Sequence, residues 1–254
     1  MEEYAVHNLS LFPRRDIRLA ACVSGGVRSL TNPEVFLSLR DSLESTQTNF
    51  KVFYVLDMND AYGSRGPTAV DDLHQVLSEL PATGFLEFAQ PEHLRRQPDC
   101  LEDQWNCPLI GMQLDACTQQ IEHYELVQGL EFQWILRVRP DMAHHNQVGP
   151  IWRYDPNFVH MPACRKWACC NDKFAVIPRR FWQVYQRGYK NSDGSFICGS
   201  DSSLLQMGIP SGSTHCGCLQ WAYFLNGENG TLQAIFQPQV PMLAGTYFSG
   251  LKIQ

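Results

Sequence analysis

The sequence has no long apolar run and no excess of positive charge. No stretch approaches the roughly 18 consecutive apolar residues that a membrane-spanning helix needs, so we expect no membrane span in this chain. The 20 lysines and arginines are outnumbered by 26 aspartates and glutamates, which gives a formal net charge of −6. Domains that bind nucleic acid normally present a basic face, so nucleic acid is not an expected partner.

The beginning of the chain lacks the features of a secretory signal peptide. Residues 1–7 contain neither a basic segment nor the start of an apolar segment, so no signal peptide is predicted. A luminal domain separated from an upstream anchor would also lack a signal peptide. The expected compartment therefore has to be inferred from the cysteines.

Ten cysteines are many for a reduced cytosolic enzyme of this length. Their even number and their clustering in the second half of the chain fit disulfides in an oxidising compartment, and sequons at Asn8 and Asn229 favour it too. We therefore expect the secretory pathway or Golgi lumen if the cysteines are bonded, and the cytoplasm otherwise. Free buried thiols remain the alternative for Cys22 and Cys117. Without a paired C-x-x-C spacing, zinc is a weaker alternative, with candidate ligands Cys164, Cys169, Cys170, Cys198, His215, Cys216 and Cys218.

Two common nucleotide-binding fingerprints are also missing. The apolar run 17–23 leads into Ser-Gly-Gly-Val-Arg-Ser at 24–29, which is not G-x-G-x-x-G and has no Gly-Lys-Ser/Thr after it. A strand that ends in such a turn lets backbone N–H groups approach an anion, and Arg28 is placed to clamp a phosphate. An ordinary strand-to-helix turn is the alternative.

The most informative stretch that is present covers residues 132–142, Phe-Gln-Trp-Ile-Leu-Arg-Val-Arg-Pro-Asp-Met. Its apolar part predicts a buried strand, which Pro140 should end because proline has no N–H. Asp141 would then lie at the strand tip. Arg137 and Arg139 share a parity and should face one side, which must offer carboxylates, phosphates or water because desolvating a charge costs several kcal/mol. The alternative is a structural salt bridge to a nearby acid.

Apolar periodicity predicts alternating strands and helices along most of the chain. Thr31 or Asn32 should cap the helix that starts at Pro33, whereas His144 and His145 should lie in a polar loop. This order predicts a mostly parallel sheet with right-handed crossovers. The predicted strands are 17–23, 50–56, 85–88, the strand from 132 that Pro140 ends, an added strand at 159–162 and a short apolar strand within 171–178. The predicted helices after the first are 68–80, 109–129 and 179–189.

Three polar features follow strands of this predicted sheet, namely Arg28, the segment from Asp57 to Asp60, and Asp141. The carboxyl ends of parallel strands share one edge, which is the usual ligand crevice of an open α/β sheet. A carboxylate beside phosphate-binding arginines is reasonable if a divalent cation bridges them, and Mg²⁺ or Mn²⁺ prefers such oxygen ligands.

Several motifs together resemble a group of GT-A-fold glycosyltransferases that includes bacterial capsule and lipopolysaccharide enzymes and related plant and algal proteins. The resemblance covers roughly residues 17–210. In that family an Arg-x-Arg-x-Asp tip takes the place of the Asp-x-Asp motif. The motifs are Cys-Val-Ser-Gly-Gly-Val-Arg-Ser-Leu at 22–30, Gln113, Tyr124-Glu125, Trp-Ile-Leu-Arg-Val-Arg-Pro-Asp at 134–141 and Asn-Asp-Lys-Phe-Ala at 171–175.

The resemblance implies one α/β domain over residues 1–254. It would be a GT-A-like, Rossmann-like three-layer sandwich with a central, mostly parallel sheet and an irregular, cysteine-rich C-terminal part. Residues 17–142 would form the half that binds the nucleotide sugar, and residues 143–254 the acceptor side.

On the donor side, the resemblance implies that Arg28, with Gly25 and Gly26, contacts the nucleotide or its diphosphate. Asp141 would bind the metal or the donor ribose. The tip carries a single acid where Asp-x-Asp carries two, so the sequence predicts metal dependence less strongly than Asp-x-Asp would. The alternative for Asp141 is a cap of the next turn. Arg139 would support the phosphates, and Arg137 is a further donor-binding candidate on the same strand. Asp57 is a candidate for a different reason, because acids that follow an early strand of an open α/β sheet contact a ribose or base.

On the acceptor side, the resemblance places Asp172 beside the donor sugar or the acceptor. Asp201 would be the general base that deprotonates the acceptor hydroxyl, and His215 a second metal ligand. A loop anchor remains the alternative for Asp172, and a helix N-cap for Asp201.

The implied activity is that of a hexosyltransferase, with a UDP-sugar as donor, a glycan or other hydroxyl as acceptor, and Mn²⁺ or Mg²⁺ as cofactor. A non-catalytic, disulfide-stapled GT-A-like domain that binds glycans or a protein is the alternative. A sugar-phosphate nucleotidyltransferase is disfavoured because the turn lacks the longer glycine- and lysine-bearing loop of triphosphate chemistry.

Overall fold

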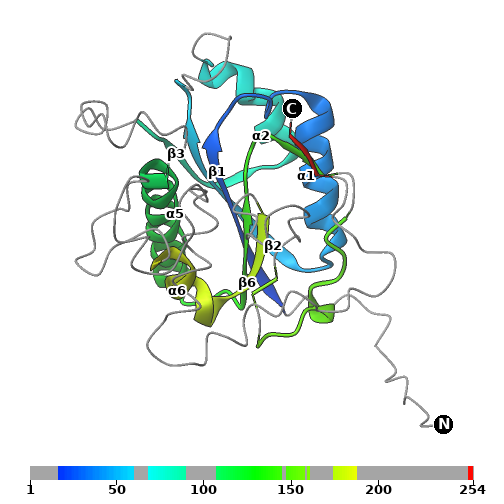
Figure 1. The fold of residues 1–254 in the computed structure, drawn as a ribbon, viewed down its shortest axis with the longest axis vertical. Coiled ribbons are helices and arrows are strands. Elements are labelled where there is room, and N and C mark those ends of the chain that lie inside the picture. Colours follow the sequence, from blue (N-terminus) through cyan, green and yellow to red (C-terminus); the bar gives the residue numbers. More distant parts are fainter. Residues whose placement is uncertain are drawn as a thin grey trace, which may run out of the picture.

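The chain forms an α/β fold around one five-stranded sheet of order β3-β2-β1-β4-β6 (Figure 1). β1 to β4 run parallel, and β6 lies antiparallel to β4 at the edge. The strands are β1 (Arg18–Gly26), β2 (Asn49–Asp57), β3 (Ala82–Glu87), β4 (Trp134–Val138) and β6 (Phe174–Pro178). The computed structural model describes residues 17–59, 68–89, 107–144, 147–157, 159–160, 174–187 and 251–253.

Helices cover both faces of the sheet and form three layers with it. α1 (Pro33–Ser45) and α2 (His74–Glu79) lie on one side, and α5 (Cys107–Gln128) and α6 (Trp182–Arg187) on the other (Figure 1). Alternate residues of β1 serve the two cores: Val23 joins the core under α1, whereas Cys22 joins the core under α5. A strand buried on both faces reads as a nearly continuous apolar run. The predicted α/β class with a mostly parallel central sheet is confirmed.

The start of α1 follows the predicted capping chemistry. The Asn32 side chain accepts a hydrogen bond from the Glu34 backbone N–H at 3.0 Å, and Pro33 occupies the first helical position. Asparagine at this position satisfies one backbone donor that the first turn leaves open. The chain therefore turns from β1 into α1 within six residues, 27–32.

Several local predictions need correction. The helix predicted over 68–80 is a 3₁₀ turn (Val70–Leu73) followed by the short α2, and Val70 is half exposed. Leu126, expected on the apolar stripe of α5, is 81% exposed. His144 is buried in a further short strand, β5 (Met142–His144), which pairs antiparallel with β7 (Leu251–Ile253). Periodicity read from one segment does not show which face a neighbour will cover.

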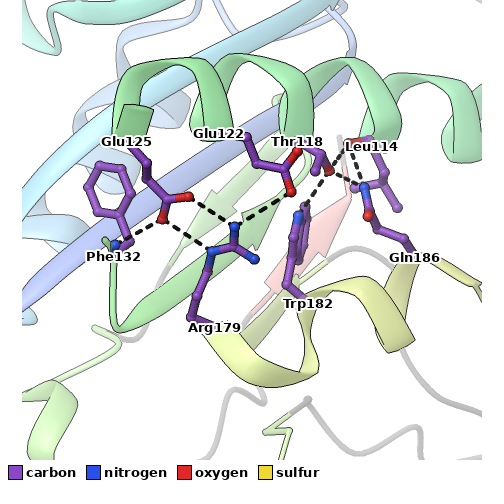
Figure 2. A network of polar contacts seen from close by, with 8 residues as sticks. All are labelled: Leu114, Thr118, Glu122, Glu125, Phe132, Arg179, Trp182 and Gln186. Atoms are coloured by element: carbon purple, nitrogen blue, oxygen red, sulfur yellow. Dashed lines mark hydrogen bonds and ion pairs between the residues drawn. The ribbon is translucent and has the colours of Figure 1, made fainter. Parts of the chain in front are cut away.

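At the end of the sheet where β4 begins, a polar network joins α5 to the segment after β6 (Figure 2). Arg179 donates two hydrogen bonds to the carboxylate of Glu125, from Nε at 3.1 Å and from Nη2 at 2.9 Å. The same carboxylate accepts the Phe132 backbone N–H at 2.9 Å. Glu125 therefore satisfies both a guanidinium and the chain just before β4.

Beside this pair, three side chains connect α5 to α6 (Figure 2). Trp182 donates its indole N–H to the hydroxyl oxygen of Thr118 at 2.9 Å. Thr118 donates in turn to the Leu114 carbonyl at 2.8 Å, and Gln186 donates to the same carbonyl at 3.0 Å. Buried polar groups with such partners hold one packing arrangement of the two helices.

A disulfide joins Cys22 of β1 to Cys117 of α5, with a Cα–Cα distance of 6.1 Å. The alternative of free thiols at these two positions is therefore wrong, because the fold brings them together across 95 residues of chain. The zinc candidates named above lie outside the described residues. None of the helices in the described part of the chain is long and apolar enough to cross a membrane.

Candidate functional site

Two arginines converge on one carboxylate where β1 and β4 end. Asp141 Oδ2 accepts from Arg28 Nη1 at 2.9 Å and from Arg139 Nη2 at 2.8 Å, while Asp141 Oδ1 accepts from Arg139 Nε at 2.9 Å. The Asp141 side chain is 1% exposed, whereas those of Arg28 and Arg139 are 30% and 18% exposed. We call these three residues the arginine–aspartate cluster. It presents guanidinium surface to solvent and keeps the carboxylate inside.

The turn after β1 carries Arg28 in a left-handed conformation, with φ of 36°. Backbone hydrogen bonds hold this turn: Val27 donates to the Asp57 carbonyl at 3.1 Å, and Leu30 to the Val27 carbonyl at 2.7 Å. Left-handed backbone at a non-glycine residue costs about 1 to 3 kcal/mol and persists only where the surroundings enforce it. The end of β2 and the Asp141 carboxylate are the surroundings that hold Arg28 in place.

Gly25 and Pro140 bring the two halves of the cluster into direct contact. Gly25 has φ of +146°, and a Cβ atom there would lie 2.9 Å from Pro140 Cδ and 3.3 Å from Pro140 Cγ. The position therefore excludes a side chain for two reasons, backbone conformation and the proline ring. Glycine is required here by the packing of β1 against the β4 tip, which is a different reason from the predicted approach of a ligand.

Arg137 lies fully buried near the end of β4, opposite Cys22 of β1. Its Nη1 donates to the Ser24 carbonyl at 2.9 Å and also to the Val138 carbonyl. Carbonyl oxygens are partners that the sequence-based prediction did not consider, because it named only carboxylates, phosphates and water. Arg137 thus ties the end of β1 to the end of β4 beneath the arginine–aspartate cluster.

The acidity of Asp141 reflects this setting. Burial by itself raises the pKa of the carboxyl, but the charges and hydrogen bonds of Arg139 and Arg28 outweigh it, so the pKa lies below its usual value of 3.8. An opposite charge at hydrogen-bond distance favours the ionised form. Asp141 is therefore a carboxylate at neutral pH, and the two arginines share one negative charge.

The remaining predicted site residues are placed only in part. Asp57 ends β2 opposite Gly26, and its Oδ1 accepts the Asn59 backbone N–H at 3.0 Å. Asp172, Asp201 and His215 lie outside the described residues. Two contributors escaped the sequence analysis, the Ser24 carbonyl and the Pro140 ring as a packing partner. Both could have been predicted only by placing β4 beside β1 at the correct register, with Cys22 opposite Arg137.

The described residues do not fit a divalent metal at Asp141. Mg²⁺ and Mn²⁺ need carboxylate oxygens with open lone pairs, but both oxygens of this buried carboxylate accept hydrogen bonds from guanidinium groups. Across the described ranges, no group of three or more His, Cys, Asp or Glu side chains could hold a metal ion. The cluster as built can orient two guanidinium groups toward an anion.

Comparisons with known proteins find likeness in structure alone. No protein-family model matches the chain, and no characterised protein matches its sequence. The chain is similar to the galactosyltransferase LgtC, with 9% identity and a TM-score of 0.37 over 66% of this chain and 59% of that one. A glycosyltransferase involved in glycosylation of the major capsid of PBCV-1 aligns with 12% identity and a TM-score of 0.34, over 69% and 68% of the two chains.

The glycosyltransferase GlyE of Streptococcus pneumoniae aligns with 9% identity and a TM-score of 0.33, over 67% of this chain and 36% of that one. The chain therefore spans about 59% of the length of LgtC and about 36% of that of GlyE.

Proposed function

We propose that this chain is a glycosyltransferase that moves a sugar from a nucleotide-diphosphate donor, a UDP-sugar, to a glycan or other hydroxyl acceptor. The observation that carries the proposal is the arginine–aspartate cluster at the carboxyl edge of β1 and β4. This edge is where open α/β sheets bind their ligands. The resemblance of the Arg-x-Arg-Pro-Asp tip to that of GT-A-fold enzymes supports the same assignment.

Guanidinium groups suit the donor's diphosphate for geometric and electrostatic reasons. Arginine offers planar, paired N–H donors that match phosphate oxygens and stays charged at all relevant pH values. Arg28 and Arg139 are the two partly exposed arginines of the cluster. When the bond between the sugar and the diphosphate breaks, negative charge grows on the departing nucleotide, and prepositioned cations stabilise it.

The other predicted residues complete the proposed reaction. Gly25, Gly26 and Asp57 flank the donor at the ends of β1 and β2, and Asp172 serves the sugar or the acceptor. Asp201 takes the proton of the acceptor hydroxyl as the new glycosidic bond forms and the nucleoside diphosphate leaves.

The test is release of nucleoside diphosphate from a panel of UDP- and GDP-sugars, with and without glycan acceptors. We expect wild-type protein to release UDP, and Arg28→Gln to lower the rate at least tenfold. Arg40→Gln is the matched control, because Arg40 is also paired with an acid, Glu79, and its side chain is similarly exposed at 29%. If no donor is turned over, the non-catalytic alternative replaces this proposal.

A further inference from the structure

Asp141 has the contacts of an anchor for arginines. All three hydrogen bonds described above to its carboxylate come from guanidinium N–H groups, and they involve both oxygens. Arg139 pairs with it bidentately, which fixes the plane of the guanidinium as well as its position. Arg28 comes from a segment 113 residues away. One buried carboxylate thus sets the relative placement of two cations from different strands.

The charges at this edge already favour an anion. Within the arginine–aspartate cluster, the two guanidinium groups of Arg28 and Arg139 share the single carboxylate of Asp141, which leaves one formal positive charge. A divalent cation at Asp141 would have to displace guanidinium groups from the carboxylate. It would then lie within a few ångströms of those same cations, in a partly buried place where repulsion between charges is strong.

We propose that the site binds the donor's diphosphate through Arg28 and Arg139 without a divalent metal, and that Asp141 is a positioning residue for these arginines. This inference rests on the proposed function, because it concerns how the donor of that reaction is held. The guanidinium groups supply the charge neutralisation that a metal supplies at a metal-dependent diphosphate site. Asp141 keeps them at the sheet edge and orients their partly exposed guanidinium groups.

The decisive measurement is calorimetric titration of the full chain with UDP, GDP and inorganic pyrophosphate, once in EDTA and once in excess Mn²⁺. We expect binding in EDTA at least as tight as in Mn²⁺, because Mn²⁺ complexes the free ligand and adds nothing to the site. The affinity in EDTA should fall as salt is raised, since the contacts are between charges. Binding that is tenfold or more tighter in Mn²⁺ would overturn the inference.

Variants separate the two roles of Asp141. If it positions the arginines, Asp141→Asn weakens UDP binding by the same factor in EDTA and in Mn²⁺. If it were a metal ligand, the loss would appear only in Mn²⁺, and the inference would fail. Arg28→Gln should weaken binding at least tenfold in EDTA and Arg28→Lys less, while Arg40→Gln should match wild type. If Asp141→Asn does not fold, the Arg28 series in EDTA still decides whether the arginines hold the diphosphate without a metal.

The same experiments distinguish failure of this inference from failure of the proposed function. UDP release that requires Mn²⁺ would support the proposed glycosyltransferase activity and refute the metal-free binding of the diphosphate. UDP release that is equal in EDTA supports both. Absence of UDP and GDP binding and of donor turnover under either condition rejects the glycosyltransferase, and the inference with it.

Discussion

Replacing Gly25 by alanine tests how β1 and the β4 tip are joined. The new methyl group would meet Pro140 Cδ at 2.9 Å, and the residue would keep φ of +146°. Backbone strain of this kind costs about 1 to 3 kcal/mol, and forcing extra atoms into a packed contact costs about 1 to 3 kcal/mol more. We therefore expect Gly25→Ala to lower the free energy of unfolding by about 2 to 6 kcal/mol.

Gly129→Ala is the matched control for backbone strain alone. Gly129 ends α5 with φ of +60°, and a Cβ atom there would have nothing within 4 Å. Only the left-handed backbone penalty of about 1 to 2 kcal/mol applies. Urea unfolding, followed by tryptophan fluorescence, gives both values. The difference between them contains the contact with Pro140 together with the extra backbone strain at φ of +146°.

Gly25→Ala should also weaken UDP binding, because displacing Pro140 moves the adjacent Asp141 away from Arg28. The control at Gly129 should leave UDP affinity unchanged. Equal losses of stability in the two variants would show that Pro140 does not constrain Gly25. Unchanged UDP affinity in Gly25→Ala would show that the junction does not position the site.

Three further predictions concern the rest of the fold. Glu125→Gln should lower the free energy of unfolding in urea by about 2 to 3 kcal/mol, because it breaks a charge pair with Arg179 that also holds a backbone N–H. The control is Glu122→Gln, whose side chain is 46% exposed and lies 3.6 Å from Arg179. This change should cost under about 1 kcal/mol. Reducing the disulfide between Cys22 and Cys117 should lower the free energy of unfolding by about 4 to 5 kcal/mol, because the intact disulfide closes a loop of 95 residues. Thiol titration checks that the disulfide is present. An equal melting temperature with and without reductant would contradict this prediction. The lowered pKa of Asp141 stabilises the fold above the unfolded value of 3.8, so the stability difference between wild type and Asp141→Asn should be constant above about pH 5 and shrink as the pH falls further. A difference that does not change between pH 7 and pH 2 would contradict this.

Local features of the fold followed from the sequence because they depend on neighbours in the chain. The Asn32 cap needs only the Glu34 N–H two residues away, and the end of β4 needs only the missing N–H of Pro140. Alternation of apolar segments with helical and strand periods predicted the α/β class and the mostly parallel sheet. The errors at Val70, Leu126 and His144 arose where exposure depends on a distant element.

The candidate site was predicted as a set of residues and not as a set of contacts. Arg28 and Asp141 were expected at one edge because parallel strands share it, yet they lie 113 residues apart. Their hydrogen bond depends on β4 packing beside β1 and on Gly25 admitting the Pro140 ring. Arg137 was expected to contact carboxylates, phosphates or water. In the structure it donates instead to backbone carbonyl oxygens, because β1 and β4 place these carbonyls beside its guanidinium group.

The sequence by itself determined the α/β class, the capped helix after β1, the strand that ends at Pro140 and the types of residue gathered at the sheet edge. These are properties of local hydrogen bonding and of apolar period. Only the tertiary structure decided that Cys22 is bonded to Cys117, that Arg137 is buried on carbonyl oxygens, and that both Asp141 oxygens accept from guanidinium groups. Each of these contacts depends on which strands become neighbours and at what register. Strand order and register are in turn set by the burial of the two apolar cores, one on each face of the sheet.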